Sequence, residues 1–301
     1  MPITTTSLIE EFLDADIEFS LLASGIRQYK IPHPSSGLLA NASFFNHPEW
    51  AKKYFDACHR DDAFKERWQA AAGSWDNKIV VDIGCGPGNL FATLGGSPRL
   101  LIGVDISEGA LGMAQQLGYT PILADAHNLP LQSGFADIVT VNATLHHCDD
   151  MQKVLMEAAR LVRPGGKLVI DHDPQKTAWD YQGIMLWLYH MRLWVYQLFL
   201  PGLHIPRDER LAALSTELHH CPGDGVTSEL FLSLRTLGFE VSLYPHNHTV
   251  GAEALQHELG IPPHWRYRLG QRLSGINPDS SEAALSLMCV AKRRSELSSH
   301  G

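Results

Sequence analysis

The stretch Val80–Leu90 reads VVDIGCGPGNL and decides how the rest of the chain is interpreted. Two β-branched residues lead into an acid, Asp82, and glycines then fall at every second position, at Gly84, Gly86 and Gly88. A short apolar run that ends in glycines is typical of a buried strand followed by a tight turn. Because glycine tolerates positive φ and lets a ligand approach the backbone closely, the stretch predicts a strand–loop–helix unit whose loop holds a ligand.

The spacing of these glycines indicates which kind of ligand the loop holds. A dinucleotide-binding turn has the pattern G-x-G-x-x-G, which places a pyrophosphate at the start of a helix. This loop instead has G-x-G-x-G, and Asp82 lies two residues before its first glycine. A carboxylate at that position is unfavourable beside a phosphate and suits a cationic group. The loop therefore favours a ligand with an amino-acid end, and an NAD-dependent oxidoreductase is the weaker alternative.

Short runs rich in Val, Ile and Leu alternate with helical segments from Lys78 onward. The strands predicted from these runs are 79–84, 100–106, 120–125, 136–143, 166–173, 239–246 and 284–293. Most of them do not alternate between apolar and polar residues, which is typical of parallel strands buried on both faces. Helices are predicted over 109–118, 151–162 and 226–237, and the Pro164-Gly165-Gly166 turn should separate the second of these from the next strand. The last two strands should form an antiparallel closing pair.

The fold class predicted from this alternation is α/β, with a doubly wound, seven-stranded, mostly parallel Rossmann-like sheet and an α-helical cap. We expect an N-terminal helical cap over 1–76, without a strong strand and with one helix over Pro48–Ala72. A cofactor-binding core over 77–173 follows, then an apolar helical lid over 174–225. Residues 226–301 complete the core and include an insertion at 250–283.

The composition limits the classes of function that this chain can have. The chain has 301 residues, of which 45% are hydrophobic and 19% charged, as in ordinary globular proteins. Its formal net charge of -9 disfavours nucleic acid as a partner. Five cysteines without paired spacing fit a reducing compartment, and the acidic N-terminus does not resemble a secretion signal, so we expect a cytoplasmic location.

Five segments, in sequence order, resemble motifs of class I S-adenosylmethionine-dependent methyltransferases. The first is VVDIGCGPGNL, and the second is Asp105, an acid that ends the next strand 17 residues after Gly88. The others are LADAHNLP (123–130), FADIVTVNATLHHCDD (135–150) and LVRPGGKLVI (161–170). The nearest branch is the small-molecule one that includes quinone-biosynthesis methyltransferases. The resemblance covers about residues 78–173 and the closing strands.

The resemblance implies S-adenosyl-L-methionine as cofactor, with Asp105 on the ribose hydroxyls and with Asp125 and Ala126 beside the adenine. The positions that it assigns to the cofactor are Asp82, Gly84, Cys85, Gly86, Gly88, Asn89, Asp105, Ile106, Asp125, Ala126 and Asn142. The implied activity is methyl transfer to an O or C atom of a small hydrophobic or aromatic metabolite. Two alternatives remain open: a cofactor-binding enzyme of this fold that catalyses a non-methylating, cyclisation-type reaction, and a catalytically silent binding module.

Histidines at two strand ends are the candidates for proton transfer, because the carboxyl ends of parallel strands face the ligand crevice. They are His146 and His147 after the fourth strand and His172 after the fifth; packing or a cofactor contact is the alternative role for each. Sixteen histidines also raise the question of a metal. The pairs at 172–173, 219–220 and 246–248 lack a recognised ligand spacing, so no metal site is predicted. The tetrapeptide LHHC occurs at 145–148 and again at 218–221, a recurrence short enough to arise by chance.

Residues 177–200 form an almost wholly apolar stretch with Trp179, Trp187 and Trp194. Gln182, His190 and Gln197 fall on one narrow stripe of a helix, so the helix should be covered nearly all round. Charged and polar residues near its middle disfavour a membrane span. We favour a lid that walls the substrate site, with a homodimer contact and a membrane-interface contact as alternatives. Aromatic and methionine-rich walls favour an apolar or aromatic small molecule as substrate.

Overall fold

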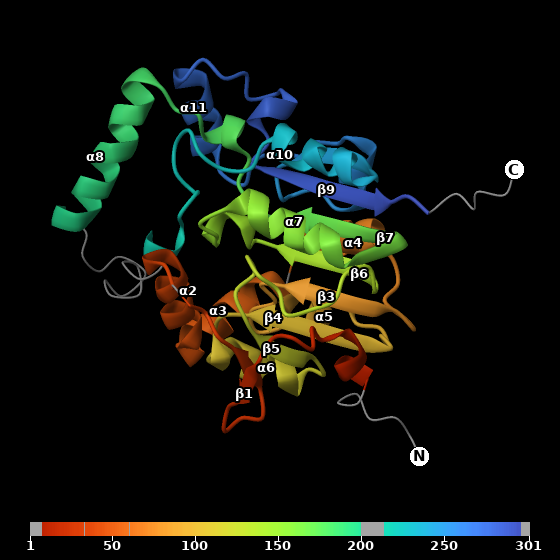
Figure 1. Ribbon diagram of the computed structural model, residues 1–301. Helices are drawn as coiled ribbons and strands as arrows, with labels where there is room; N and C mark the ends of the chain where they lie inside the picture. Colours follow the sequence, from red (N-terminus) through yellow and green to blue (C-terminus); the bar gives the residue numbers. More distant parts are fainter. Residues whose placement is uncertain (1–7, 33, 60, 200–213, 296–301) are drawn as a thin grey trace, which may run out of the picture.

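The computed structural model describes residues 8–32, 34–59, 61–199 and 214–295, and the side chains of 57–59 and 192–199 lie outside this description. Its centre is a nine-stranded sheet in the order β1-β2-β5-β4-β3-β6-β7-β9-β8 (Figure 1). The strands are β1 (Phe19–Leu21), β2 (Arg27–Tyr29), β3 (Ile79–Ile83), β4 (Leu100–Asp105), β5 (Thr120–Leu123), β6 (Ala136–Asn142), β7 (Val162–Asp171), β8 (Phe239–His246) and β9 (Ser286–Arg293).

The pairing of the strands confirms a mostly parallel, doubly wound sheet. Strands β2, β5, β4, β3, β6 and β7 are parallel neighbours in that order. Strand β9 runs antiparallel to both β7 and β8, which is the predicted closing pair. The chain reverses direction across the sheet at β3, so the carboxyl ends of β3, β4 and β6 lie beside one another where a ligand crevice is expected.

The strand count differs from the seven predicted, because the N-terminal segment supplies a hairpin. Strands β1 and β2 are antiparallel, and β2 adds to the free edge of β5. Residues 1–76, which were expected to be a helical cap without a strong strand, therefore contribute two short strands to the sheet. Each of these strands has three residues, and β1 is exposed throughout, so neither leaves an apolar run that a sequence pattern could show.

Helices cover both faces of the sheet and divide the core into two clusters. On one face, α7 (Met151–Leu161) and α10 (Ser228–Leu232), which leads into the 3₁₀ helix η4 (Ser233–Leu237), bury Val154, Leu155 and Phe231. On the other face, α4 (Asp62–Ala72), α5 (Asn89–Leu94) and α6 (Glu108–Gln116) bury Trp68 and Leu111. All five residues of β3 are buried, as two-sided coverage requires.

Two predicted boundaries are corrected. The helix expected over 48–72 is two helices, α3 (Pro48–His59) and α4, and the Asp61 side chain caps α4 by accepting a hydrogen bond from the Phe64 amide. This cap fixes a helix start in the middle of an otherwise continuous aromatic pattern. The turn expected at Pro164-Gly165-Gly166 lies inside β7, because α7 already ends at Leu161 and the strand begins at Val162.

The remaining elements are short, apart from α8. They are α2 (Ser36–Asn46), α11 (Trp265–Leu273) and the 3₁₀ helices η1 (Glu10–Phe12), η2 (Leu145–His147), η3 (Lys176–Trp179), η5 (Ala252–Gln256) and η6 (Ser281–Ala283). Helix α8 (Gly183–Phe199) extends away from the sheet beside α11 (Figure 1). None of the helices in the described part of the chain is both long and apolar enough to cross a membrane.

Candidate active site

A cavity lies where the carboxyl ends of the central strands meet helices α2 and α3. The cavity and its mouth hold about 710 Å³ of empty volume. Predicted site residues contribute much of its lining: Gly84, Gly86, Asp105, Ile106, Asp125, Ala126, Asn142 and His147. Asp82, Cys85, Gly88, Asn89, His146 and His172, also predicted for the site, are not in its lining. The structure thus gathers residues from four strand ends around one space.

The three glycines of the loop after β3 have positive φ and different surroundings. At Gly84 (φ +66°) a Cβ atom would lie 2.3 Å from the Thr144 hydroxyl oxygen, so the loop packs directly on the segment after β6. At Gly86 (φ +52°) a Cβ atom would meet no atom within 4 Å, and the residue lines the cavity. Gly88 (φ +91°) is the N-cap of α5 and packs against Leu117. Only Gly86 leaves open space in which a ligand can approach the backbone.

Asp82 lies behind the cavity and not on its wall. Its two carboxylate oxygens accept hydrogen bonds from the Thr140 hydroxyl and the Tyr119 hydroxyl, each at 2.8 Å. Burial raises the pKa of Asp82 to about 7, although both hydrogen bonds oppose this shift. Cys85 is also buried, and burial holds the pKa of its thiol well above the usual value. The cysteine is therefore a packed thiol, as its position between two glycines suggests.

Two acids on the cavity wall are held by neighbouring polar groups. Asp105 accepts hydrogen bonds from the Gly86 amide and the Ser107 amide, both at 2.9 Å, so it ties the glycine loop to the end of β4. Asp125 accepts from the amide of His127 and lies 2.6 Å from its Nδ1. Burial would raise the pKa of Asp125, but the hydrogen bonds from His127 outweigh it and lower that pKa. Both carboxylates therefore have fixed orientations at the cavity.

The end of β6 brings an unpaired polar atom to the cavity. Asn142 is buried, and its side-chain oxygen has no hydrogen-bond partner within the described chain. The next residue, Ala143, also lines the cavity and has a φ of +49°, a conformation that L residues rarely adopt. A buried oxygen without a donor and a strained backbone at one strand end are features that a bound ligand would explain. The Asn89 oxygen is likewise buried and unpaired, but Asn89 lies outside the lining.

The two histidines after β6 have different surroundings. His147 lines the cavity and places Nδ1 2.7 Å from the Thr216 carbonyl. Burial and the neighbouring His146 lower the pKa of His147 to about 3. His146 is buried and places Nδ1 2.7 Å from the Asp173 carboxylate. Burial alone would lower the pKa of His146, but the hydrogen bond and charge of Asp173 raise it. At pH 7, His147 is therefore a neutral imidazole at the cavity wall.

Comparison with known proteins agrees with this geometry. Residues 81–170 match the family described as "Methyltransferase domain". The ubiquinone biosynthesis O-methyltransferase of Thiobacillus denitrificans is 30% identical over 137 residues, which are 42% of this chain and 59% of that protein. A tRNA (carboxymethyluridine(34)-5-O)-methyltransferase of Arabidopsis thaliana is 32% identical over 137 residues, 41% of this chain and 33% of that protein. The match thus spans between about one third and three fifths of the curated relatives' length.

Residues 81–170 of this chain thus match a methyltransferase domain, and this core is similar to class I S-adenosylmethionine-dependent methyltransferases. The plantazolicin methyltransferase BpumL, solved with a monoazolic substrate analogue and SAH, has the same fold, with a TM-score of 0.51 over 86% of this chain and 95% of that chain. At 13% identity this likeness concerns the fold alone. The strand ends that line the cavity all lie within the matched residues 81–170. Segments outside these residues form the opposite wall of the cavity.

The opposite wall of the methyltransferase cavity was not predicted from the sequence. Leu38 and Phe45 on α2 and Tyr54 on α3 line it. The Phe45 ring stands edge-on to the rings of Tyr54 and His147, with centroids 5.8 and 6.4 Å away. The aromatic residues of 48–72 were recognised as a helical pattern, but no local signal shows which of them faces a cavity.

A segment that follows the apolar helix within the predicted lid region also packs against the site. Residues 214–221 pack on the loop after β6, where the His219 amide donates to the His146 carbonyl at 3.0 Å and His219 Nε2 lies 3.0 Å from the Cys148 carbonyl. The two LHHC tetrapeptides are therefore in contact, although the recurrence of four residues gives no physical reason to expect this pairing. The same segment carries Glu217, whose carboxylate lies 3.6 Å from His146 Nε2.

His172, the third predicted catalytic histidine, belongs to a different cluster. Arg67 on α4 donates to the Asp171 carboxylate at 2.9 Å, and both side chains are fully buried. His246 Nε2 lies 2.7 Å from the other Asp171 oxygen, and His172 packs its ring on Phe64 and lies beside this ion pair. Burial lowers the pKa of His172 far below the usual value. The cluster joins α4 to the ends of β7 and β8.

The predicted lid helix does not line the methyltransferase cavity with any of its described side chains. Helix α8 packs on α11 near its start, where Met185 lies against Gly270. Ile184 and Trp187 are 62% and 58% exposed, so the expectation of nearly complete coverage is wrong. The helix projects from the molecule, and its contact with α11 covers only part of its surface. Trp194, named in the same apolar stretch, lies outside the described side chains.

Proposed function

We propose that this protein transfers the methyl group of S-adenosyl-L-methionine to an O or C atom of a small hydrophobic or aromatic metabolite. The observation that carries the proposal is the two-sided cavity. Asp105, Asp125 and the Asn142 oxygen face it from the strand ends, and Leu38, Phe45 and Tyr54 face it from α2 and α3. One wall suits a polar nucleoside with an amino-acid end, and the other suits an apolar ring.

On the strand side, we propose that Asp105 accepts from the ribose hydroxyls while Gly86 lets the amino-acid end approach the backbone. Asp125, Ala126 and Ile106 would surround the adenine, and the Asn142 oxygen would receive the donor that it lacks in the protein alone. Gly84 lines the cavity beside Gly86, whereas Asp82, Cys85, Gly88 and Asn89 lie outside the lining and would act indirectly by shaping the loop. Asp82 does so by accepting hydrogen bonds from Tyr119 and Thr140.

The bound cofactor supplies an activated sulfonium methyl, so the chain's own residues mainly align the acceptor and exclude water. His147 is the only one of the three predicted catalytic histidines that lines the cavity, and we propose it for the contact with the acceptor. His146 would hold the loop after β6 through Asp173, and His172 would hold α4 in place. The ubiquinone biosynthesis O-methyltransferases among the relatives support an oxygen atom as the acceptor.

Two measurements test the proposal. Calorimetry with S-adenosylhomocysteine should show one site, and Asp105→Asn should weaken binding roughly 10- to 100-fold, the value of hydrogen bonds to a charged group. A screen with radiolabelled cofactor and phenolic acceptors should then show label in an organic product. Phe45→Ala should raise the KM for that acceptor and leave cofactor affinity unchanged.

The outcomes separate the alternatives. Cofactor binding without labelled product from any acceptor, with the cofactor recovered intact, would indicate a binding module. Product without label would indicate a non-methylating reaction. Tight binding of a nicotinamide dinucleotide in place of S-adenosylhomocysteine would contradict the assignment of the cavity altogether.

A further inference from the structure

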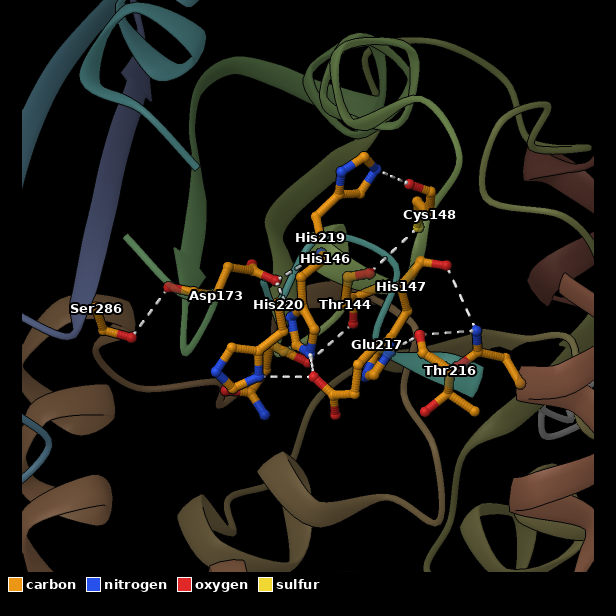
Figure 2. Close-up of polar contacts among 12 residues, drawn as sticks. Thr144, His146, His147, Cys148, Asp173, Thr216, Glu217, His219, His220 and Ser286 are labelled. Atoms are coloured by element: carbon orange, nitrogen blue, oxygen red, sulfur yellow. Dashed lines mark hydrogen bonds and ion pairs between the residues drawn. The ribbon is translucent and has the colours of Figure 1, made fainter. Parts of the chain in front are cut away.

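We propose that His146, His147 and Glu217 form a binding site for a divalent transition-metal ion, such as Zn²⁺, at the acceptor side of the cavity. One ligand atom from each of the three residues lies within 4.8 Å of the other two. Two of the residues come from η2 and the third from the 214–221 segment that packs on it (Figure 2). The proposal deepens the proposed function and rests on it for its role in catalysis.

The hydrogen bonds around the two imidazoles occupy Nδ1 of each ring and leave Nε2 as the atom that could bind a metal. His147 Nδ1 lies 2.7 Å from the Thr216 carbonyl, which only accepts, so Nδ1 carries the proton and Nε2 of the neutral ring is free. His146 Nδ1 lies 2.7 Å from the Asp173 carboxylate, which fixes the same tautomer. The two ring centroids are 3.9 Å apart. Two imidazole nitrogens are thus oriented as ligands by groups behind them.

Glu217 completes the set from the opposite side. Its Oε2 atom lies 3.6 Å from His146 Nε2 and 2.7 Å from His220 Nδ1 (Figure 2). At 3.6 Å, Oε2 and His146 Nε2 are too far apart for a hydrogen bond but close enough to bind one cation between them. Two ligands bound at ~2.0 Å with a tetrahedral angle are roughly 3.3 Å apart, so the observed separation nearly matches a shared cation.

The groups behind the ligands follow the pattern of metal sites in proteins. Metal-binding histidines donate their second N–H to a carboxylate or a backbone carbonyl, and both arrangements occur here, at Asp173 and Thr216. The carboxylate ligand is itself held, by His220. Two imidazoles and one carboxylate select borderline transition metals over Mg²⁺ and Ca²⁺, which prefer oxygen ligands.

The position of the site indicates what the ion would do. His147 belongs both to this set and to the cavity wall, so an ion held by the set would lie near an acceptor bound in the cavity. A hydroxyl bound there loses its proton to water more readily, because the cation stabilises the resulting oxyanion. That oxygen then forms the bond to the methyl group as the carbon–sulfur bond breaks. The bond's electron pair stays on sulfur and leaves S-adenosylhomocysteine.

Cobalt binding tests the site without any methyl acceptor. The chain, freed of any polyhistidine tag and treated with EDTA, is titrated with Co²⁺ and followed by its visible absorption bands; Zn²⁺ is then added as a competitor. We expect one equivalent to bind, Glu217→Gln and His147→Ala each to weaken binding at least 100-fold, and Asp173→Asn to weaken it 10- to 100-fold. His264→Gln, which replaces an exposed histidine far along the chain, is the matched control and should bind like the wild type.

Equal Co²⁺ affinity in the wild type, Glu217→Gln and His147→Ala would overturn the proposal and assign the binding to scattered surface histidines. An absence of stoichiometric binding would overturn it as well. S-adenosylhomocysteine calorimetry on the same samples separates this failure from failure of the proposed function. If the metal-free protein binds the cofactor and transfers the methyl group as well as before, the proposed function holds and the metal has no role in it.

Discussion

The two walls of the cavity are encoded in the sequence in different ways. The cofactor side consists of loops that directly follow β3, β4, β5 and β6, and each loop carries its own local pattern. The acceptor side combines α2, α3, the loop after β6 and the 214–221 segment, which lie far apart along the chain. A glycine turn or an acid at a strand end constrains the backbone locally, whereas a wall built from distant segments depends on packing that no single stretch of sequence specifies.

One of the contacts that join the two sides lies between Gly84 and Thr144. Gly84 lies in the glycine loop, and Thr144 begins the segment that carries His146 and His147. The Thr144 hydroxyl donates to the Asn142 carbonyl at 2.8 Å, so the residue is fixed in place. Any side chain at Gly84 would displace it, and the geometry of both walls depends on this contact.

Gly84→Val should therefore have the largest effect. The new side chain would collide with Thr144 at a position whose φ is +66°, so backbone strain adds to overpacking. Together these cost about 5 kcal/mol of the free energy of unfolding. Chemical denaturation measures the loss, and calorimetry should show that any folded fraction no longer binds S-adenosylhomocysteine.

Gly112→Ala is the matched control for this substitution. Gly112 lies inside α6, and a Cβ atom there would meet nothing within 4 Å. It should raise stability by about 0.5–1 kcal/mol through helix propensity, with unchanged cofactor binding. If Gly84→Val is as stable as the wild type, the contact between Gly84 and Thr144 does not determine the geometry of the two walls.

Asp82→Asn should change how stability depends on pH, with a smaller effect. The carboxyl has its usual pKa of 3.8 when unfolded and a pKa of about 7 when folded, because burial disfavours its charge. The folded state therefore binds this proton more tightly. Its stabilising contribution is complete below pH 3.8 and is lost as pH rises through 7, a change on the order of 4 kcal/mol.

The measurement is the free energy of unfolding of both proteins between pH 4 and pH 8. Asp82→Asn carries no charge, so its stability should fall less across this range than that of the wild type. Parallel curves for the two proteins would show that Asp82 is not protonated in the folded state. Asp82 lies behind the wall proposed to bind the cofactor. The same experiment therefore tests whether the fold of that wall is retained when the side chain at position 82 carries no charge.

The sequence predicted the β3–β9 strands and their antiparallel closing pair, because buried parallel strands leave continuous apolar runs. It did not predict β1 and β2, whose three residues are too short to show a period. Among the site residues, Gly86, Asp105 and Asn142 follow from local patterns. Phe45 and Glu217 do not, since their place in the site depends on how α2 and the 214–221 segment pack on the methyltransferase core.

Trp187→Ser should have the smallest effect and decides the role of α8. Trp187 is 58% exposed and does not line the cavity, so stability should change by no more than about 0.5 kcal/mol, with cofactor and acceptor binding unchanged. Sedimentation velocity and acceptor kinetics on the same protein separate the alternatives. Weaker acceptor binding would support the lid prediction, because Trp187 can affect the acceptor only if α8 reaches the cavity in solution. A lower molecular mass with normal kinetics would instead assign its exposed apolar side chains, Ile184 among them, to a contact between two copies of the chain.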